Sequence, residues 1–227
     1  MKILSVNRDA KTIKGLEYGF LTGIVYLRPS KVLCPGASKG CLAACLNTAG
    51  HGAMNCVQKA RQAKTLFYLR DTKRFMEQLD QEIQALKERA YKNSMLPAVR
   101  INGTSDIDVQ KVFKDILDKH KDVQFYDYTK VLSRMYLPWK SNYHLTFSRS
   151  EVTSLRTIKI LVKLLRRNVA VVFDDVPDEW EGMRVVNGDL NDLRFLDGQG
   201  VIVGLKAKGK GRKDISGFVV HMKGETK

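Results

Sequence analysis

The stretch Val169-Ala170-Val171-Val172-Phe173-Asp174-Asp175 decides the fold class of this chain. Five consecutive apolar residues, followed by two acidic ones, are typical of a short strand that is buried on both of its faces. Strands of this kind belong to parallel sheets whose faces are covered by helices. The stretch therefore predicts an α/β fold around a parallel sheet.

Patterns typical of strands and of helices alternate on both sides of this stretch. Strands are expected at residues 18–27, 98–101, 123–126, 143–147, 183–186, 201–205 and 218–221, and helices at 57–69, 72–91, 109–119 and 151–167. Polar residues follow successive strands, and the strand ends of a β/α barrel meet on one face. We therefore expect a single α/β domain over residues 1–227, built as a partial or distorted β/α (TIM-like) barrel, with a doubly wound sheet as the alternative.

The formal net charge of +15 favours contact with an anionic partner, such as nucleic acid or a phosphate-rich ligand. A solvated cationic surface is the alternative.

The first residues lack the pattern of a signal peptide, and no apolar run approaches the ~18 residues of a membrane span. These features predict a soluble, cytoplasmic protein without a membrane partner, in which cysteines stay reduced. The oligomeric state is left open.

All four cysteines lie in residues 28–56, a loop after the first predicted strand. They are spaced Cys34-x6-Cys41-x3-Cys45-x10-Cys56. Clustered thiolates bind zinc or iron–sulfur centres. Zinc favours gaps of ~2–4 residues between ligands, which only the gap between Cys41 and Cys45 satisfies. The loop is therefore expected to hold a [4Fe-4S] cluster, with zinc or four free cysteines as alternatives.

Two residues of the loop leave the set of ligands open. Cys56 is the most separated cysteine and begins the next predicted helix, so it is the candidate for a cysteine that does not bind. His51 lies inside the loop and can replace one cysteine. Three protein ligands would leave one iron of a cluster free to bind a ligand.

Polar residues at the following strand ends are the candidate ligand-binding residues. Asn102-Gly103-Thr104-Ser105-Asp106 combines a glycine, which permits close backbone approach, with short hydrogen-bonding side chains. Lys130 can bind a carboxylate or phosphate, and Tyr126 or Tyr128 can stack on a ring. Arg149 can bind an anion. Helix capping and ordinary packing are the alternative for each of them.

Further residues are weaker candidates for a site. His144 lies within an apolar strand, where a hydrogen-bonded core histidine is the commoner case, and Asp174 and Asp175 fit an acidic loop equally well. The basic tract at residues 206–213 can form a phosphate-binding surface with a basic helix, or it can be a solvated loop. The basic side chains of that helix are Arg156, Lys159, Lys163, Arg166 and Arg167.

Four stretches together resemble a bacteriophage-encoded family of the gene-product-88 type. They are residues 34–41 (CPGASKGC), 102–106 (NGTSD), 124–130 (QFYDYTK) and 142–150 (NYHLTFSRS). The resemblance extends from about residue 18 to residue 218. It implies a viral protein that acts in the cytoplasm of an infected bacterium, and it offers little settled function.

A weaker resemblance, in layout, is to radical S-adenosylmethionine enzymes. Those enzymes are partial β/α barrels with a cluster-binding cysteine loop after the first strand, and they contact the amino group of the cofactor after the second strand. The resemblance implies a cluster in the loop and S-adenosylmethionine near residues 102–106. The cysteine gaps differ, however: three and then two residues in those enzymes, and six, three and ten residues here.

Two functions of different class are therefore expected. The first is a cluster-binding protein on a barrel like that of the radical enzymes, with a redox or small-ligand-binding role and with catalysis left open. The second is a basic nucleic-acid-binding protein in which a zinc or iron–sulfur site is only structural. Diversion of a host protein is a third, which no residue of the sequence specifically indicates.

Overall fold

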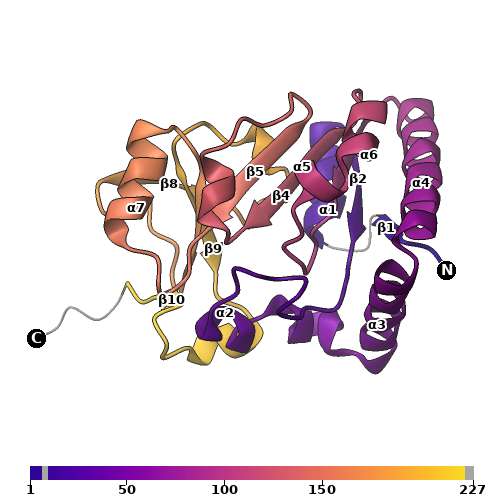
Figure 1. Ribbon diagram of the computed structural model, residues 1–227. Helices are drawn as coiled ribbons and strands as arrows, with labels where there is room; N and C mark the ends of the chain where they lie inside the picture. Colours follow the sequence, from indigo (N-terminus) through magenta and orange to yellow (C-terminus); the bar gives the residue numbers. More distant parts are fainter. Residues whose placement is uncertain (7–9, 223–227) are drawn as a thin grey trace, which may run out of the picture.

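The computed structural model describes residues 1–6 and 10–222 of the 227-residue chain (Figure 1). The helices are α1 (Ala10–Lys14), α2 (Lys39–Ala43), α3 (Asn55–Arg70), α4 (Thr72–Lys92), α5 (Val109–Val112), α6 (Lys114–Lys119), α7 (Leu155–Lys159) and a π-helical turn, η5 (Ile160–Leu164). Short 3₁₀ turns are η1 (Gly15–Tyr18), η2 (Leu46–Thr48), η3 (Gly50–Ala53), η4 (Leu132–Met135), η6 (Arg194–Leu196) and η7 (Gly209–Lys213). Within the described ranges, no helix combines the length and the apolar character that crossing a membrane requires.

The strands form one ten-stranded sheet with the order β1-β2-β3-β4-β5-β6-β9-β8-β7, and β10 pairs with β6 off this path. Their bounds are β1 (Leu4–Val6), β2 (Phe20–Val25), β3 (Leu96–Arg100), β4 (Gln124–Thr129), β5 (Tyr143–Ser148), β6 (Val169–Phe173), β7 (Glu179–Trp180), β8 (Met183–Asn187), β9 (Ile202–Lys206) and β10 (Val219–Val220). Strands β2 to β6, β9 and β8 are parallel to one another. The predicted parallel α/β fold is confirmed.

The expected β/α barrel, partial or complete, is not confirmed, because the sheet is open. Its two edges are β1, which is antiparallel to β2, and β7, which is antiparallel to β8. A barrel needs its first and last strands to pair. Here β9 lies between β6 and β8, so the order of the strands in the sheet no longer follows their order in the sequence. The two edge strands, β1 and β7, therefore do not pair with each other, and the sheet stays open.

The sheet forks between β5 and β6. Strand β9 pairs with β6 along its whole length, whereas β5 pairs only with Val169 and Ala170. At the other end of β6, β10 pairs in parallel with Val172 and Phe173. Since β9 occupies one edge of β6, β10 lies on the same edge as β5. The end of the described chain therefore fills a gap in the middle of the sheet.

One face of the sheet is apolar and is covered by α3 to α7 (Figure 1). Alternate side chains of the parallel strands point toward these helices and are fully buried, as for Val99, Phe125 and Val171. Helix α4 contributes Leu79 and Ile83, which are also 0% exposed. The period of two in the strands and the helical spacing in α4 thus meet in one core.

The opposite face is polar, and α1 and residues 188–197 cover it. Here Arg100 Nη1 lies 3.1 Å from Asp192 Oδ2, and the Tyr126 hydroxyl donates to the same carboxylate at 3.0 Å. The ring of Phe195 packs edge-on against Tyr126 and Phe20. We call this group of Arg100, Tyr126 and Asp192 the buried polar cluster.

Candidate functional site

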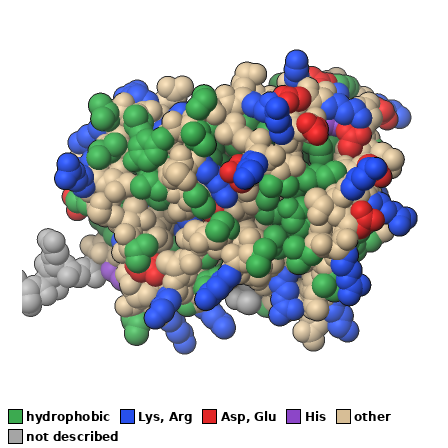
Figure 2. Space-filling model, in the orientation of Figure 1, with side chains coloured by type: hydrophobic (Ala, Val, Ile, Leu, Met, Phe, Trp, Pro, Cys, Tyr) green, Lys and Arg blue, Asp and Glu red, His purple; other side chains and the backbone are tan. Residues whose placement is uncertain are grey.

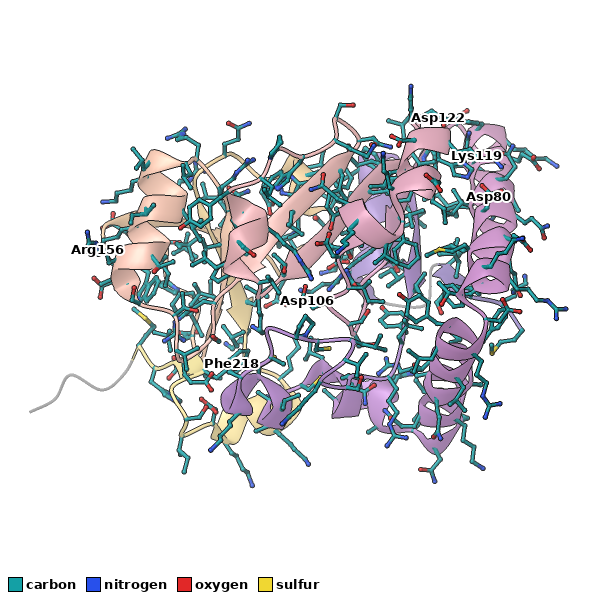
Figure 3. All side chains as sticks on the ribbon, in the orientation of Figure 1. Asp80, Asp106, Lys119, Asp122, Arg156 and Phe218 are labelled. Carbon is teal, nitrogen blue, oxygen red and sulfur yellow. The ribbon has the colours of Figure 1, made fainter. Side chains whose placement is uncertain are left out.

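The loops that follow the parallel strands gather at the lower edge of the sheet in Figure 3, where Asp106 and Phe218 are labelled. The segment with the cysteines follows β2, the Asn102–Asp106 motif follows β3, Lys130 follows β4, and Arg149 follows β5. Carboxyl ends of parallel strands are where α/β proteins build their sites. The structure therefore brings together the main motifs singled out in the sequence.

The four cysteines are not equivalent. Cys34 lies in irregular chain, Cys41 in α2, Cys45 just before η2, and Cys56 in the first turn of α3. The first three are partly buried, whereas Cys56 is exposed. Burial raises the pKa of the Cys34 thiol to about 11, and the negative charges of Asp106, Cys45 and Cys41 raise it further. Three of the four thiols thus share one electrostatic neighbourhood.

The Cys41 thiol lies in the same neighbourhood. Burial raises its pKa, Cys45 adds to the rise, and the ammonium of Lys130 opposes it. The thiols of Cys34 and Cys41 are therefore neutral at physiological pH in the metal-free protein. Across residues 1–6 and 10–222, no three Cys, His, Asp or Glu side chains stand close enough together to hold a metal ion. His51, the predicted substitute ligand, is exposed.

Glu151 fixes the helical turn that carries Cys41. Its carboxylate accepts hydrogen bonds from the Ser38 hydroxyl at 2.6 Å and from Gly40 N at 2.8 Å. Ser38 in turn caps α2 by accepting from Cys41 N at 3.1 Å. Burial opposes ionisation of Glu151, but these hydrogen bonds lower its pKa. An anionic side chain just beyond β5 therefore holds the cysteine loop onto the sheet.

Two glycines let the loop lie flat on the strand ends. A Cβ atom on Gly36 would lie 2.8 Å from the carbonyl carbon of Lys130, and one on Gly40 would lie 2.4 Å from Ser216 Oγ. Neither contact leaves room for a side chain. The close backbone approach expected of a glycine-containing loop is thus real, and it serves contact between protein segments.

The Asn102–Asp106 motif joins the cysteine loop to β3 and β4. The Thr104 hydroxyl donates to Leu27 O at 2.6 Å, and Asp106 N donates to Leu33 O at 2.7 Å. The Asn102 side chain bonds both backbone groups of Ile107, and the Ser105 hydroxyl donates to the same amide oxygen. A Cβ atom on Gly103 would lie 2.6 Å from a methyl group of Ile24. Hydrogen bonds within the chain occupy all of these side chains.

The carboxylate of Asp106 occupies the centre of this arrangement. One oxygen accepts from Lys130 N at 2.8 Å, and the other accepts from Arg134 Nη1 at 2.7 Å. Burial raises its pKa, which these partners oppose. Its labelled position in Figure 3 lies between the strands and the cysteine loop. Asp106 therefore links the loop to both neighbouring strand ends.

The Lys130 ammonium is fully partnered. It donates to Ser148 Oγ, Ser148 O and Arg149 O at 2.8 to 3.2 Å, and it lies 4.8 Å from the centre of the Phe218 ring. Burial lowers the pKa of Lys130, although Cys41, Asp106 and Glu151 favour its charged form. Its three donors are thus directed at the protein and not at a ligand.

Arg149 bridges the fork in the sheet. Its Nη1 donates to Gly217 O at 2.8 Å and to Phe218 O at 2.9 Å, while its backbone N donates to Ala170 O. Burial lowers its pKa, and Glu151 and Asp214 favour the charged form. A predicted anion-binding residue therefore holds the segment that leads into β10.

The remaining sequence candidates are dispersed. His144 lies on the polar face, where burial and the nearby charges of Arg194 and Arg167 lower its pKa to about 4. Tyr126 belongs to the buried polar cluster, and Tyr128 stacks beneath Arg100. The acidic pair beyond β6 forms surface contacts, with His221 for Asp174 and with Lys206 for Asp175.

The basic tract lies beside the cysteine loop. A Cβ atom on Gly209 would lie 3.0 Å from Ala49 Cβ, so η7 packs against the loop. Figure 2 shows Lys and Arg side chains gathered along this lower edge. The exposed side chains of the tract are Lys206, Lys208, Lys210, Arg212 and Lys213. Helix α7, whose Arg156 is labelled in Figure 3, lies at the left of the sheet, away from η7.

Sequence reasoning missed the residues that hold this edge together. Glu151 and Arg134 carry the main contacts of the cysteine loop and of Asp106, yet neither belongs to a recognised motif. A signal for Glu151 was present, because this acidic residue lies three positions after the strand end at Ser148. Arg134 lies in a connection with no periodic pattern, and no signal pointed to it.

Comparison with known proteins identifies the chain only at the level of its family. No curated protein matches it, and no solved structure matches it. Neither comparison supports the resemblance to radical S-adenosylmethionine enzymes. The match to the family described as Gene product 88 covers residues 3–222, so the chain belongs to the Gene product 88 family.

Proposed function

We propose that the protein binds a [4Fe-4S] cluster at the carboxyl edge of the sheet, through Cys34, Cys41 and Cys45. The observation that carries the proposal is the shared neighbourhood of these thiols, in which Cys45 raises the pKa of both Cys34 and Cys41. A group of mutually repelling thiolates is stabilised by bound iron, which lowers the pKa of each ligand. Cys56 is exposed and has no part in the proposal.

Binding has to draw the three thiols closer together than they lie in the metal-free protein. The chain between them suits such a change. Helix α2 has only five residues, and the segments around it are short turns and irregular chain. The hydrogen bonds of Glu151 keep α2 on the sheet while its neighbours adjust. Metal binding would therefore order the loop and release protons from the thiols.

S-adenosylmethionine is left out of the proposal. The side chains of the Asn102–Asp106 motif, Lys130 and Arg149 already use their hydrogen-bonding groups within the chain. Their arrangement supports a structural role in holding the loop. A redox role, or binding of a small ligand at an iron without a protein ligand, agrees better with a cluster that three cysteines hold.

Protein purified without oxygen tests the proposal directly. We expect about four irons and four sulfides per chain and a broad absorption near ~400 nm. Changing Cys34, Cys41 or Cys45 to Ala should remove the colour, and Cys56→Ala is the matched control that keeps it. About one zinc per chain and no colour would reject a cluster and leave a structural zinc site. Loss of the cluster in Cys56→Ala would reject the three-cysteine assignment.

A second candidate is binding of nucleic acid at the same edge. It is favoured by the contact of η7 with the cysteine loop, which places a run of exposed basic side chains beside it. Neutralising phosphates releases counterions, so affinity should fall steeply with salt. Changing Lys208, Lys210 and Arg212 to Gln should flatten the slope of log Kd against log salt. The same change of Arg156, Lys159 and Lys163 on α7 is the control.

The outcome separates the two candidates. Nucleic-acid binding that persists after the cluster cysteines are removed would make the metal centre structural at most. No binding of single- or double-stranded DNA or RNA at low salt would remove this second candidate. Action in the cytoplasm of an infected bacterium, on either candidate, stays a prediction.

A further inference from the structure

A cavity of about 280 Å³ opens on the helix-covered face, and no cysteine is among its lining residues. The connection from β4 to β5 contains only the four-residue turn η4. Parallel strands are usually joined by a crossover that includes a full helix. Because that helix is missing here, Tyr143 and Leu145 of β5, although buried, line a hollow.

The lining combines apolar and charged side chains. Its apolar part comes from Val109 of α5, Leu137 of the short connection, Tyr143 and Leu145. Asp108, Lys111 and Arg134 supply the charged groups of the lining. This combination of an apolar body with a few polar groups is typical of small-molecule sites, and the volume lies at their lower end.

The side chain of Arg134 is held rigidly against the cavity. Its Nη1 donates to Asp106 O, Asp106 Oδ1 and Thr129 Oγ1, and its Nε lies 3.6 Å from Asp108 Oδ2. No hydrogen bond to a described residue uses its Nη2. The side chain is only 13% exposed. A donor is therefore fixed in the wall with its direction set by other contacts.

The charges around the cavity balance. Arg134 and Lys111 are cationic, and Asp106 and Asp108 are anionic. A strongly charged ligand of either sign would be repelled by the two groups that carry the same charge as the ligand. A neutral ligand can accept from Arg134 and donate to Asp108. The aromatic side chain of Tyr143 in the lining favours a flat ligand that can stack on it.

We propose that this cavity binds a small, planar, uncharged heterocycle of nucleobase size that presents both hydrogen-bond donors and acceptors. The ring would lie between Val109 and Leu137, with its acceptor toward Arg134 and its donor toward Asp108. Tyr143, 5% exposed, lies beneath the ring. This site is separate from the proposed cluster and does not depend on it.

Titration of the full-length protein with adenosine, cytidine, guanosine and uridine, followed by amide NMR shifts, tests the proposal. At least one nucleoside should bind with a Kd of about 1 mM or tighter and shift amides of residues 108–111 and 134–137. Benzoate and benzamidine, flat probes of opposite charge, should bind at least about tenfold more weakly. Tighter binding of either charged probe would overturn the assignment of a neutral ligand.

Two matched variants locate the site. Leu137→Trp fills the cavity from its rim, where the native side chain is 53% exposed, and should weaken binding at least about tenfold. Leu164→Trp on η5, at a side chain 74% exposed, should leave the Kd unchanged. Absence of binding by all four nucleosides at about 10 mM, or equal binding to both variants, would overturn the proposal.

Discussion

The two faces of the sheet are buried by different means. The helix-covered face packs apolar side chains such as Phe125 and Val171, both 0% exposed. The other face buries Arg100, Tyr126 and Asp192 and depends on their mutual hydrogen bonds. Apolar packing tolerates small losses gradually, whereas a buried polar group without its partner is costly. The faces should therefore respond differently to mutation and to pH.

The largest effect is expected on the apolar face. Phe125→Ala removes a fully buried ring and should lower the free energy of unfolding by about 3–5 kcal/mol, measured by urea denaturation. Leu137→Ala, at a side chain 53% exposed, is the control and should change it by less than about 0.5 kcal/mol. A loss below about 1 kcal/mol for Phe125→Ala would show that this face is loosely packed.

On the polar face, Asp192→Ala leaves the Arg100 guanidinium and the Tyr126 hydroxyl without their shared acceptor. Removing one partner of a buried ion pair should cost about 3 kcal/mol in the same denaturation experiment. Asp118→Ala breaks an exposed ion pair with Lys140 and should have little effect. Equal effects of the two variants would mean that solvent screens the buried polar cluster.

The two faces should also differ in the sign of their pH dependence. Burial raises the pKa of Asp127, on the helix-covered face, to about 8, so the folded protein holds a proton there that the unfolded chain releases near pH 4. The contribution of Asp127 to the free energy of unfolding therefore falls as pH rises from about 4 to 8. Burial lowers the pKa of His144, on the polar face, to about 4. The contribution of His144 to the free energy of unfolding therefore falls as pH drops from about 6.5 to 4.

These windows overlap below pH ~6.5, where the contributions oppose each other, and of these two groups only Asp127 titrates between about 6.5 and 8. Asp127→Asn should remove a fall of about 1–2 kcal/mol over the upper window, measured by denaturation at several pH values. His144→Gln should leave the upper window unchanged and steepen the fall below it. An unchanged upper window in Asp127→Asn would assign that titration to another group.

The smallest effect compares one tyrosine hydroxyl from each face. Tyr126 donates to Asp192 at 3.0 Å, whereas Tyr143 lies 3.5 Å from Asp127 Oδ2. Tyr126→Phe should cost about 1 kcal/mol, and Tyr143→Phe should cost less than about 0.5 kcal/mol. Thermal denaturation of both variants measures the difference. The reverse order would contradict the ranking of these two contacts by length.

Sequence patterns predicted the helix-covered face well. The apolar run at residues 169–173 is strand β6 with the same bounds, and the helical spacing at 72–91 is α4 within one residue. Continuous apolar runs and helical periods report burial against one apolar surface, which is what this face provides. The predicted helix at 109–119 is divided at Phe113, and that at 151–167 is shortened to α7 and a π-helical turn.

The polar face and the open sheet could not be predicted in the same way. Arg100 lies between two apolar residues, and Tyr126 lies between Phe125 and Asp127. In these patterns, both side chains equally fit a solvent-exposed face. Their cover comes from residues 188–197, far along the chain, so only tertiary structure shows the burial. The order of β9 and β8 has no local signal either, and the polar residues after successive strands, on which the expectation of a barrel depended, occur at the carboxyl edge of an open parallel sheet as well.

At the site, sequence reasoning found the segments but not their contacts. The cysteine loop, the Asn102–Asp106 motif, Lys130 and Arg149 do meet at one edge. Whether a side chain faces a ligand or a neighbouring carbonyl depends on angles that spacing does not encode. Membership of the Gene product 88 family supports the expected bacteriophage origin.

The position of β10 has a consequence for how the chain is made. Ribosomes synthesise proteins from the amino terminus, and β10 is the last described strand to appear. Strands β5 and β6 therefore emerge well before the segment that fills the fork between them. Until then their unpaired backbone groups are open to other strands, including those of neighbouring nascent chains. Synthesis of β10 completes the middle of the sheet, and with it the protection against misassembly.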